Sequence, residues 1–192
     1  MALTPSRMLP LGTPAPAFCL PTADGQTVAL ADLADARALI VVFMCNHCPY
    51  VKHIRAQLAQ LGRDVADMNV AMVGINANDP VAYPNDNLAA MKVEAETHGY
   101  TFPYLQDETQ EVAKAYHAAC TPDIYLFDAE RNLVYRGQLD ASRPGNGVPN
   151  DARDLRAALE ATLAGEPVNQ DQQPSLGCNI KWRPGNEPAW FG

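Results

Sequence analysis

The sequence lacks an apolar segment long enough to cross a membrane, and it lacks an excess of basic residues. No uninterrupted apolar run approaches the ~20 residues that a membrane-spanning helix needs. Of 192 residues, 14 are Lys or Arg and 22 are Asp or Glu, so the formal net charge is −8. A charge of this sign repels nucleic acid and anionic membrane surfaces. We therefore expect neither a nucleic acid nor a membrane as a partner.

The chain also lacks a signal-peptide core at its start, because prolines interrupt residues 1–16. This absence predicts a cytoplasmic protein, and thiols in the cytoplasm are kept reduced. The hydrophobic content of 47% is ordinary for a globular chain and is large enough for a core. We expect one domain over residues 1–165 and a C-terminal extension, residues 166–192, that packs on it.

Cysteine is scarce but patterned. Of five cysteines, Cys45 and Cys48 form a C-x-x-C motif directly after the apolar run 38–44. The motif is followed by apolar residues at helical spacing, namely Ile54, Leu58, Leu61 and Val65. This order predicts a buried strand, a tight turn and an amphipathic helix. The two thiols would then lie where unpaired N–H groups and the helix dipole stabilise an anion.

This position favours a thiolate, which is the form of cysteine that attacks sulfur. A free thiol titrates near ~8.5, whereas a C-x-x-C thiol at a helix start can titrate at about 3.5–7. We expect Cys45 to feel most of the helix dipole and to attack, and Cys48 to be more buried, less acidic and to resolve. A charged His47 between them would lower the pKa of Cys45 further. This interpretation requires Cys45 to be reachable from solvent.

Other uses of the two cysteines are weaker. A structural zinc site would need a second close Cys or His pair, but only His53 is near, and Cys120 and Cys178 are isolated. A copper chaperone would need a histidine from elsewhere as its third ligand. A structural disulfide across so short a loop would contribute little stability. We therefore expect a redox pair, with no resident metal and no cofactor.

The rest of the chain alternates predicted strands and helices. A strand at 69–76 would lie parallel to 38–44 after a right-handed crossover. A hairpin is expected around Asp24-Gly25, with strands at 17–20 and 26–30, and a short helical turn follows at 30–33. The other predictions are helices over 86–98, 109–117 and 151–164, an extended segment at 102–105, and an antiparallel hairpin with strands at 121–128 and 133–137.

These pieces resemble the thioredoxin fold, in its redoxin branch of the alkyl hydroperoxide reductase/thiol-specific antioxidant (AhpC/TSA) type. The resemblance covers about residues 10–165, and its marks are the C-x-x-C after a strand and the Thr-Pro that opens a hairpin. Three strings, at 43–50, 119–123 and 177–182, resemble a bacterial peroxiredoxin-like subgroup with a Cys-Asn-His-Cys motif. The resemblance implies a three-layer α/β/α sandwich with an N-terminal β-hairpin and a C-terminal tail.

The resemblance also implies roles for single residues. Cys45 matches the family's nucleophile and Cys48 its resolving cysteine. Pro122 matches a cis-proline that faces the disulfide and turns the backbone of Thr121 toward an incoming peptide strand. An ordinary trans proline is the alternative. Thioredoxin has a buried carboxylate beneath its cysteines, and the strand at 38–44 offers none.

The remaining thiols are less defined. Cys120, two residues before Pro122, is either a third active-site thiol or a passive neighbour. We expect Cys178 to be structural, although a tail folded back over the site would bring it closer.

Three functions follow from these features. A thiol–disulfide oxidoreductase would reduce disulfides of a protein or a small thiol partner and would draw on an unknown electron donor. A peroxiredoxin, with an antioxidant role, would have the spacing P-x-x-x-T/S-x-x-C. Counting back from Cys45 gives Val42 and Ala38, so the hydroxyl that orients peroxide is missing. A non-catalytic binding module would not need both cysteines. We favour the first, with the peroxidase as the alternative.

Overall fold

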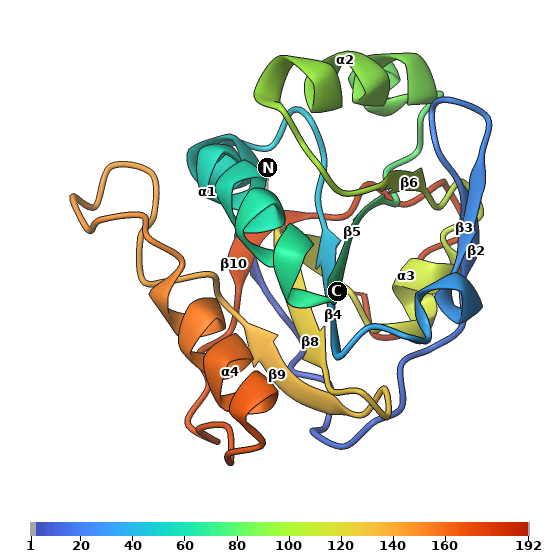
Figure 1. The fold of residues 1–192 in the computed structure, drawn as a ribbon. Coiled ribbons are helices and arrows are strands. Elements are labelled where there is room, and N and C mark those ends of the chain that lie inside the picture. Colours follow the sequence, from blue (N-terminus) through green and yellow to red (C-terminus); the bar gives the residue numbers. More distant parts are fainter. Residues whose placement is uncertain (1–2, 192) are drawn as a thin grey trace.

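A five-stranded mixed β-sheet forms the centre of the protein. The computed structural model describes residues 3–191, and the strands of this sheet run in the order β6-β5-β4-β8-β9 (Figure 1). β4 pairs in parallel with β5, and β5 with β6, whereas β4–β8 and β8–β9 are antiparallel pairs. The strands are β4 (Ala38–Phe43), β5 (Val70–Asn76), β6 (Tyr104–Gln106), β8 (Asp123–Phe127) and β9 (Leu133–Gly137).

Helices and a hairpin cover the two faces of this sheet. Side chains of α1, α2 and α4 share one hydrophobic core with the sheet, and those of α3 and the hairpin β2–β3 share the other. The α/β sandwich with an N-terminal hairpin is therefore confirmed. The elements are α1 (Pro49–Val65), α2 (Leu88–His98), α3 (Glu111–Ala115), α4 (Arg153–Ala164), β2 (Cys19–Pro21), β3 (Thr27–Ala29) and the 3-10 turns η1 (Leu30–Leu33), η2 (Ala66–Met68) and η3 (Pro84–Asp86).

β4 and α1 together position the C-x-x-C motif. All six residues of β4 are buried, and its side chains alternate between the two cores. A fully buried aliphatic side chain contributes about 1.5–3 kcal/mol relative to an exposed one. The loop between β4 and α1 therefore starts and ends at well-anchored points. The buried residues of α1 are Val51, Ile54, Leu58, Ala59, Leu61, Gly62 and Val65.

No helix in the described part of the chain is both long enough and apolar enough to span a bilayer.

A second, smaller sheet joins the two ends of the chain to the middle. β10 (Leu176–Asn179) lies between β1 (Leu3–Pro5) and β7 (Cys120–Thr121), and both pairings are antiparallel. Figure 1 shows β10 in red close to the start of α1. The sequence predicts no strand at this place, because the Leu-Gly-Cys-Asn segment is short and contains a glycine. The boundary expected at residue 165 stays a prediction, since nothing tests how the chain divides into units.

β10 comes exceptionally close to β7 at Gly177. A Cβ added at Gly177 would lie 2.0 Å from the carbonyl oxygen of Thr121 and 2.6 Å from its carbonyl carbon. Both atoms belong to backbone, so a side chain cannot be accommodated by a simple rotamer change. A glycine is therefore required here by space.

We predict that Gly177→Ala lowers the free energy of unfolding by about 1–3 kcal/mol, as overpacking does. A suitable control is Gly145→Ala, where nothing lies within 4 Å of the added Cβ and only the positive φ of 81° is unfavourable. Urea unfolding of both variants measures the difference. Equal destabilisation of the two variants would contradict the close approach of β10 to β7.

Candidate active site

The C-x-x-C motif lies in the loop between β4 and α1. α1 begins at Pro49, so Cys48 is its N-cap residue and Cys45 precedes the helix. Proline at the first helical position loses no hydrogen bond, because that N–H has no partner within the helix. The Thr121–Pro122 peptide bond is cis, as the resemblance implies.

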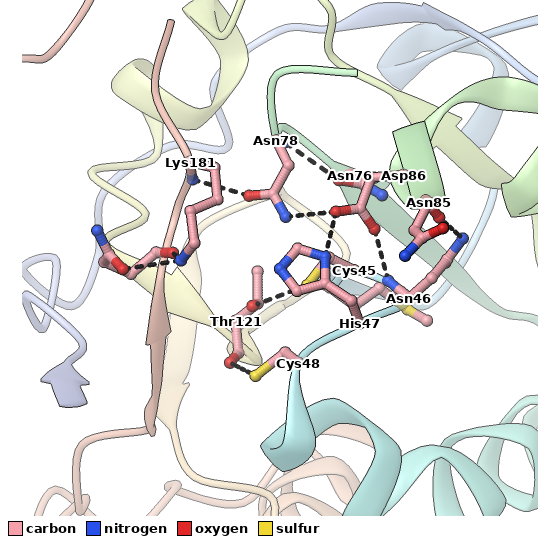
Figure 2. A network of polar contacts seen from close by, with 12 residues as sticks. Cys45, Asn46, His47, Cys48, Asn76, Asn78, Asn85, Asp86, Thr121 and Lys181 are labelled. Atoms are coloured by element: carbon pink, nitrogen blue, oxygen red, sulfur yellow. Dashed lines mark hydrogen bonds and ion pairs between the residues drawn. The ribbon is translucent and has the colours of Figure 1, made fainter. Parts of the chain in front are cut away.

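Thr121 contacts both sulfurs of the motif. Its hydroxyl Oγ1 lies 3.3 Å from Sγ of Cys45, and its carbonyl oxygen lies 3.1 Å from Sγ of Cys48 (Figure 2). The thiols of Cys45, Cys48 and Cys178 also belong to one buried cluster, and the other two thiols both influence the pKa of Cys48. The site therefore brings together the two predicted cysteines, the predicted threonine and a thiol that was expected to be structural.

The structure reverses the predicted order of acidity of the two motif thiols. The hydrogen bond from the Cys45 thiol is the largest influence on Cys48 and lowers its pKa to about 4, although burial opposes this shift. Hydrogen bonds from the Cys178 thiol and from the N–H groups of Val51 and Cys178 lower it as well. The pKa of Cys45 is raised well above its usual value, by the hydrogen bond with Cys48, by burial and by the Asp86 carboxylate. The electrostatics of the pair therefore favour a negative charge on Cys48 over one on Cys45.

The position of the helix start acts in the same direction as the Cys45 thiol, which has the largest influence. The sequence predicts a start near Cys45, but α1 begins at Pro49, and the N–H of Val51 in its first turn points to Cys48. The stabilising N–H groups and the positive end of the dipole therefore act on the second cysteine. The Thr121 carbonyl opposes the anion, because it accepts a hydrogen bond only from a protonated Cys48.

Both sulfurs are closed off from solvent. Cys45 is 1% exposed and Cys48 is 0% exposed, so the expectation that Cys45 is reachable is wrong for this conformation. β10 covers the cis-proline loop on one side. His47, whose side chain is 20% exposed, has a ring nitrogen within 4.8 Å of Cys45 Sγ. A reaction with any molecule from outside therefore requires part of this cover to move.

A buried carboxylate, Asp86 of η3, holds the motif loop in place. Its Oδ1 accepts a hydrogen bond from the N–H of Asn46 at 2.8 Å, and its Oδ2 lies 2.6 Å from Nδ1 of His47 (Figure 2). Nδ2 of Asn78 also donates to Oδ2, at 2.9 Å. Burial alone would raise the pKa of Asp86, but these hydrogen bonds outweigh it and lower the pKa. The sequence carries no signal for Asp86, since it lies in a loop far along the chain.

Two aromatic rings complete the support of this loop. The ring of Tyr83 stacks on that of His47 with centroids 5.6 Å apart. The hydroxyl of Tyr104, on β6, donates to Oδ1 of Asn46 at 2.9 Å. The dipeptide between the cysteines is therefore held by residues of β6 and η3.

Part of this cluster has the composition of a metal site. Cys45, His47 and Asp86 each offer one ligand atom, and these atoms lie within 4.8 Å of one another. Thiolate, imidazole and carboxylate together suit zinc. A metal would first have to displace the proton of Cys45 and the contact between His47 and Asp86. The expectation of no resident metal stays a prediction.

The other predicted thiol, Cys120, does not exchange a proton with the motif cysteines. Its thiol donates to the carbonyl oxygen of Pro122 at 3.4 Å, and burial raises its pKa well above the usual value. The structure therefore favours the passive alternative for Cys120. All five cysteines of the chain are free thiols.

A second buried carboxylate follows the cis-proline. Asp123 lies opposite Phe43 in the pairing of β8 with β4, and burial raises its pKa to about 7. Its Oδ2 accepts a hydrogen bond from the N–H of Ala119 at 3.2 Å. The strand at 38–44 contains no acid, and the buried carboxylate comes instead from the neighbouring strand β8.

Vicinal thiols at a helix start, opposite a cis-proline and on a sheet of this order, define a thioredoxin-fold thiol protein. The model of the AhpC/TSA family matches residues 11–136, and the chain belongs to this family. A relative from Pseudomonas fluorescens biotype C, named thiol:disulfide interchange protein DsbE, is 34% identical over 132 residues. The match covers 66% of this chain and 64% of that protein, so this chain spans slightly less than two thirds of the relative.

Solved structures are similar over nearly the whole chain. One from Sinorhizobium meliloti 1021 is 50% identical with a TM-score of 0.94, and covers 95% of this chain and 100% of its own. One from Geobacillus kaustophilus is 52% identical with a TM-score of 0.94, and covers 96% and 98%. A peroxidoxin from Mycobacterium tuberculosis is 19% identical with a TM-score of 0.58, covers 81% and 96%, and shares the fold.

The electrostatics of the pair predict where its thiolate appears. The ultraviolet thiolate absorbance of the reduced protein should titrate with a midpoint near pH 4. In Cys48→Ser this step should be absent, and no thiolate should form below about pH 8, where an unperturbed thiol begins to ionise. Cys120→Ser is the matched control and should keep the acidic step. An acidic step that survives in Cys48→Ser but is lost in Cys45→Ser would contradict the assignment.

Proposed function

We propose that this protein is a thiol–disulfide oxidoreductase in which Cys45 and Cys48 are the reacting pair. The two thiols are oxidised to one Cys45–Cys48 disulfide while a substrate disulfide is reduced to two thiols. Two electrons and two protons pass to the substrate, through a mixed disulfide between enzyme and substrate. An external reductant then restores the two thiols.

The observation that carries this proposal is the placement of two thiols at the start of α1, with both sulfurs in contact with Thr121. The pKa of Cys48 is lowered to about 4 chiefly by the hydrogen bond from Cys45, so the pair is ionised at neutral pH without any external base. A thiolate beside a protonated thiol is the state from which disulfide exchange starts. The family membership and the relative named as a thiol:disulfide interchange protein support the same chemistry.

The proposed order of attack, with Cys45 first, needs a proton to move, because the electrostatics favour the charge on Cys48. Attack by Cys45, with resolution by Cys48, requires the proton of Cys45 to pass to Cys48 along the hydrogen bond that joins them. The carbonyl oxygen of Thr121, 3.1 Å from Cys48 Sγ, accepts from Cys48 once the proton has arrived. His47 is held by Asp86 beside Cys45, where a positive charge on its ring would stabilise the attacking sulfur.

The proposed substrates are disulfides of a protein or of a small thiol, and the electron donor is a cellular reductant. In a reducing cytoplasm the direction would be reduction of the substrate, whereas a stabilised thiolate favours the reduced pair and makes it more oxidising, so the reduction potential decides the direction. The strand edge beside Thr121 is filled by β10, so an extended peptide can pair there only after β10 has moved. A small disulfide does not need to pair with that edge, but part of the cover over the two sulfurs must still move to admit it.

Turnover of insulin disulfides with dithiothreitol as reductant tests the proposal. We expect the wild-type protein to reduce insulin, and Cys45→Ser and Cys48→Ser each to fall to the rate without protein, because each removes one of the two sulfurs that form the disulfide. Cys19→Ser, which changes an exposed thiol on β2, should retain full activity. A wild-type protein without activity, or a Cys48→Ser variant that turns over normally, would reject the proposal.

Peroxide reduction is a second candidate, and one contact favours it. Although the peroxiredoxin spacing is missing around Cys45, Thr121 places a hydroxyl 3.3 Å from Cys45 Sγ from another part of the chain. A hydroxyl at this distance can orient a peroxide and also helps to lower the pKa of Cys45.

Thr121→Val tests this candidate, because valine keeps the shape and removes the hydroxyl. If the protein consumes hydrogen peroxide, this variant should lose most of the activity, about 10²-fold if one catalytic hydrogen bond is lost. Insulin reduction by the same variant is the internal control and should change less. Peroxide consumption that is unchanged in Thr121→Val would remove the hydroxyl from the mechanism.

A further inference from the structure

The strand edge beside the reactive pair is occupied by the protein itself. β7 presents its backbone next to Cys45 and Cys48, and an exposed edge of this kind binds an extended peptide through main-chain hydrogen bonds. Here β10 pairs with β7, with Cys178 opposite Thr121 and Asn179 opposite Cys120. The occupant of the edge therefore carries a cysteine, and this cysteine faces the residue that contacts both motif sulfurs.

The register brings three thiols into one buried cluster. Cys45, Cys48 and Cys178 belong to the same core and are 1%, 0% and 4% exposed. Cys48 is the member that interacts with both of the others, since each of their thiols lowers its pKa. Thr121 contacts Cys45 through its hydroxyl and Cys48 through its carbonyl, and it pairs with Cys178 in the strand.

The chain on both sides of Cys178 is fastened so that the thiol stays at this place. Before β10, the N–H of Ser6 donates to the carbonyl of Ser175 at 2.9 Å. After β10, the N–H of Lys181 donates to Oδ1 of Asn78 at 2.8 Å. Asn78 also binds Asp86, which holds the motif loop, so the tail and the motif share one support. The tail is thus held to the same network that orders the reactive pair (Figure 2).

We propose that Cys178 is a third reactive thiol of this site, which exchanges with the Cys45–Cys48 disulfide to form a Cys48–Cys178 disulfide. The inference rests on the proposed function, because the oxidoreductase reaction supplies the Cys45–Cys48 disulfide on which Cys178 acts.

The exchange is balanced within the chain. Sγ of Cys178 loses its proton and attacks Sγ of Cys48, so the Cys48–Cys178 bond forms while the Cys45–Cys48 bond breaks. Cys45 leaves as a thiolate and takes up the proton. One disulfide replaces another, and no external oxidant or reductant is consumed.

The state of the pair controls when the exchange begins. In the reduced site, burial and then the hydrogen bond to Cys48 raise the pKa of Cys178 to about 12, so its thiol keeps its proton. In the Cys45–Cys48 disulfide, Cys48 carries no negative charge, so it no longer raises the pKa of Cys178. The Cys48–Cys178 bond then ties β10 covalently to the start of α1 and leaves Cys45 free. Oxidation thereby closes the strand edge, and reduction permits it to open.

Disulfide mapping of the full-length protein tests the inference. The reduced protein is oxidised with a limiting amount of diamide and quenched in acid. Its free thiols are blocked with N-ethylmaleimide, and the digest is analysed by mass spectrometry. We expect wild type to contain both Cys45–Cys48 and Cys48–Cys178 disulfides. In Cys45→Ser, where diamide oxidises Cys48 directly and Cys178 then displaces the diamide adduct, Cys48–Cys178 should form alone. Cys178→Ser should contain Cys45–Cys48 alone, and the control Cys120→Ser should match wild type.

The outcome that overturns the inference is a wild-type protein with only the Cys45–Cys48 disulfide, together with Cys178 fully alkylated. Wild type decides this without any variant, so a variant that fails to fold does not leave the question open. Insulin turnover separates the two proposals. If wild type reduces insulin but never forms Cys48–Cys178, the role of Cys178 is rejected and the oxidoreductase stands. If wild type does not reduce insulin, the proposed function itself fails.

Discussion

Hydrogen bonds that converge on the sulfur of Cys48 set the chemistry of this site. The Cys45 thiol has the largest influence on its pKa, and the Cys178 thiol and the N–H groups of α1 and β10 act in the same direction, so that together they outweigh burial and lower the pKa to about 4. The anion is therefore made by donors that the fold brings from three separate segments. Loss of the start of α1 or of β10 would remove groups that lower the pKa of Cys48, and this pKa would return toward that of an ordinary thiol.

The sulfur of Cys48 is both buried and reactive. A sulfur that is 0% exposed is protected from indiscriminate oxidation, yet it keeps the charge that disulfide exchange requires. The cover is the chain's own tail, whose pairing with β7 depends on the absence of a side chain at Gly177. Access is consequently a conformational step, separate from the chemistry, and the tail is the part of the cover that carries a thiol of its own.

Much of the fold could be predicted because it depends on local patterns. The run 38–44 and the helical spacing after it located β4 and α1, and the Thr-Pro pair marked a cis bond that the structure contains. The exact residue at which an element begins could not be predicted. The start of α1 at Pro49, four residues after Cys45, puts the helix N–H groups nearer to Cys48 than to Cys45, and spacing alone did not resolve it. Asp86 and Cys178 reach the site only through tertiary pairing, and no local pattern in their surroundings indicates it.

The central claim is that the negative charge of the reduced pair lies on Cys48 and the proton on Cys45. The most direct measurement is a pH titration of the cysteine ¹³Cβ chemical shifts by NMR, with the full-length reduced protein labelled at cysteine. The Cys48 signal should titrate with a midpoint near pH 4, and the Cys45 signal should stay at its protonated position above pH 9, which is its usual pKa. A Cys45 signal that titrates first, or a Cys48 signal that titrates like a free thiol, would contradict it.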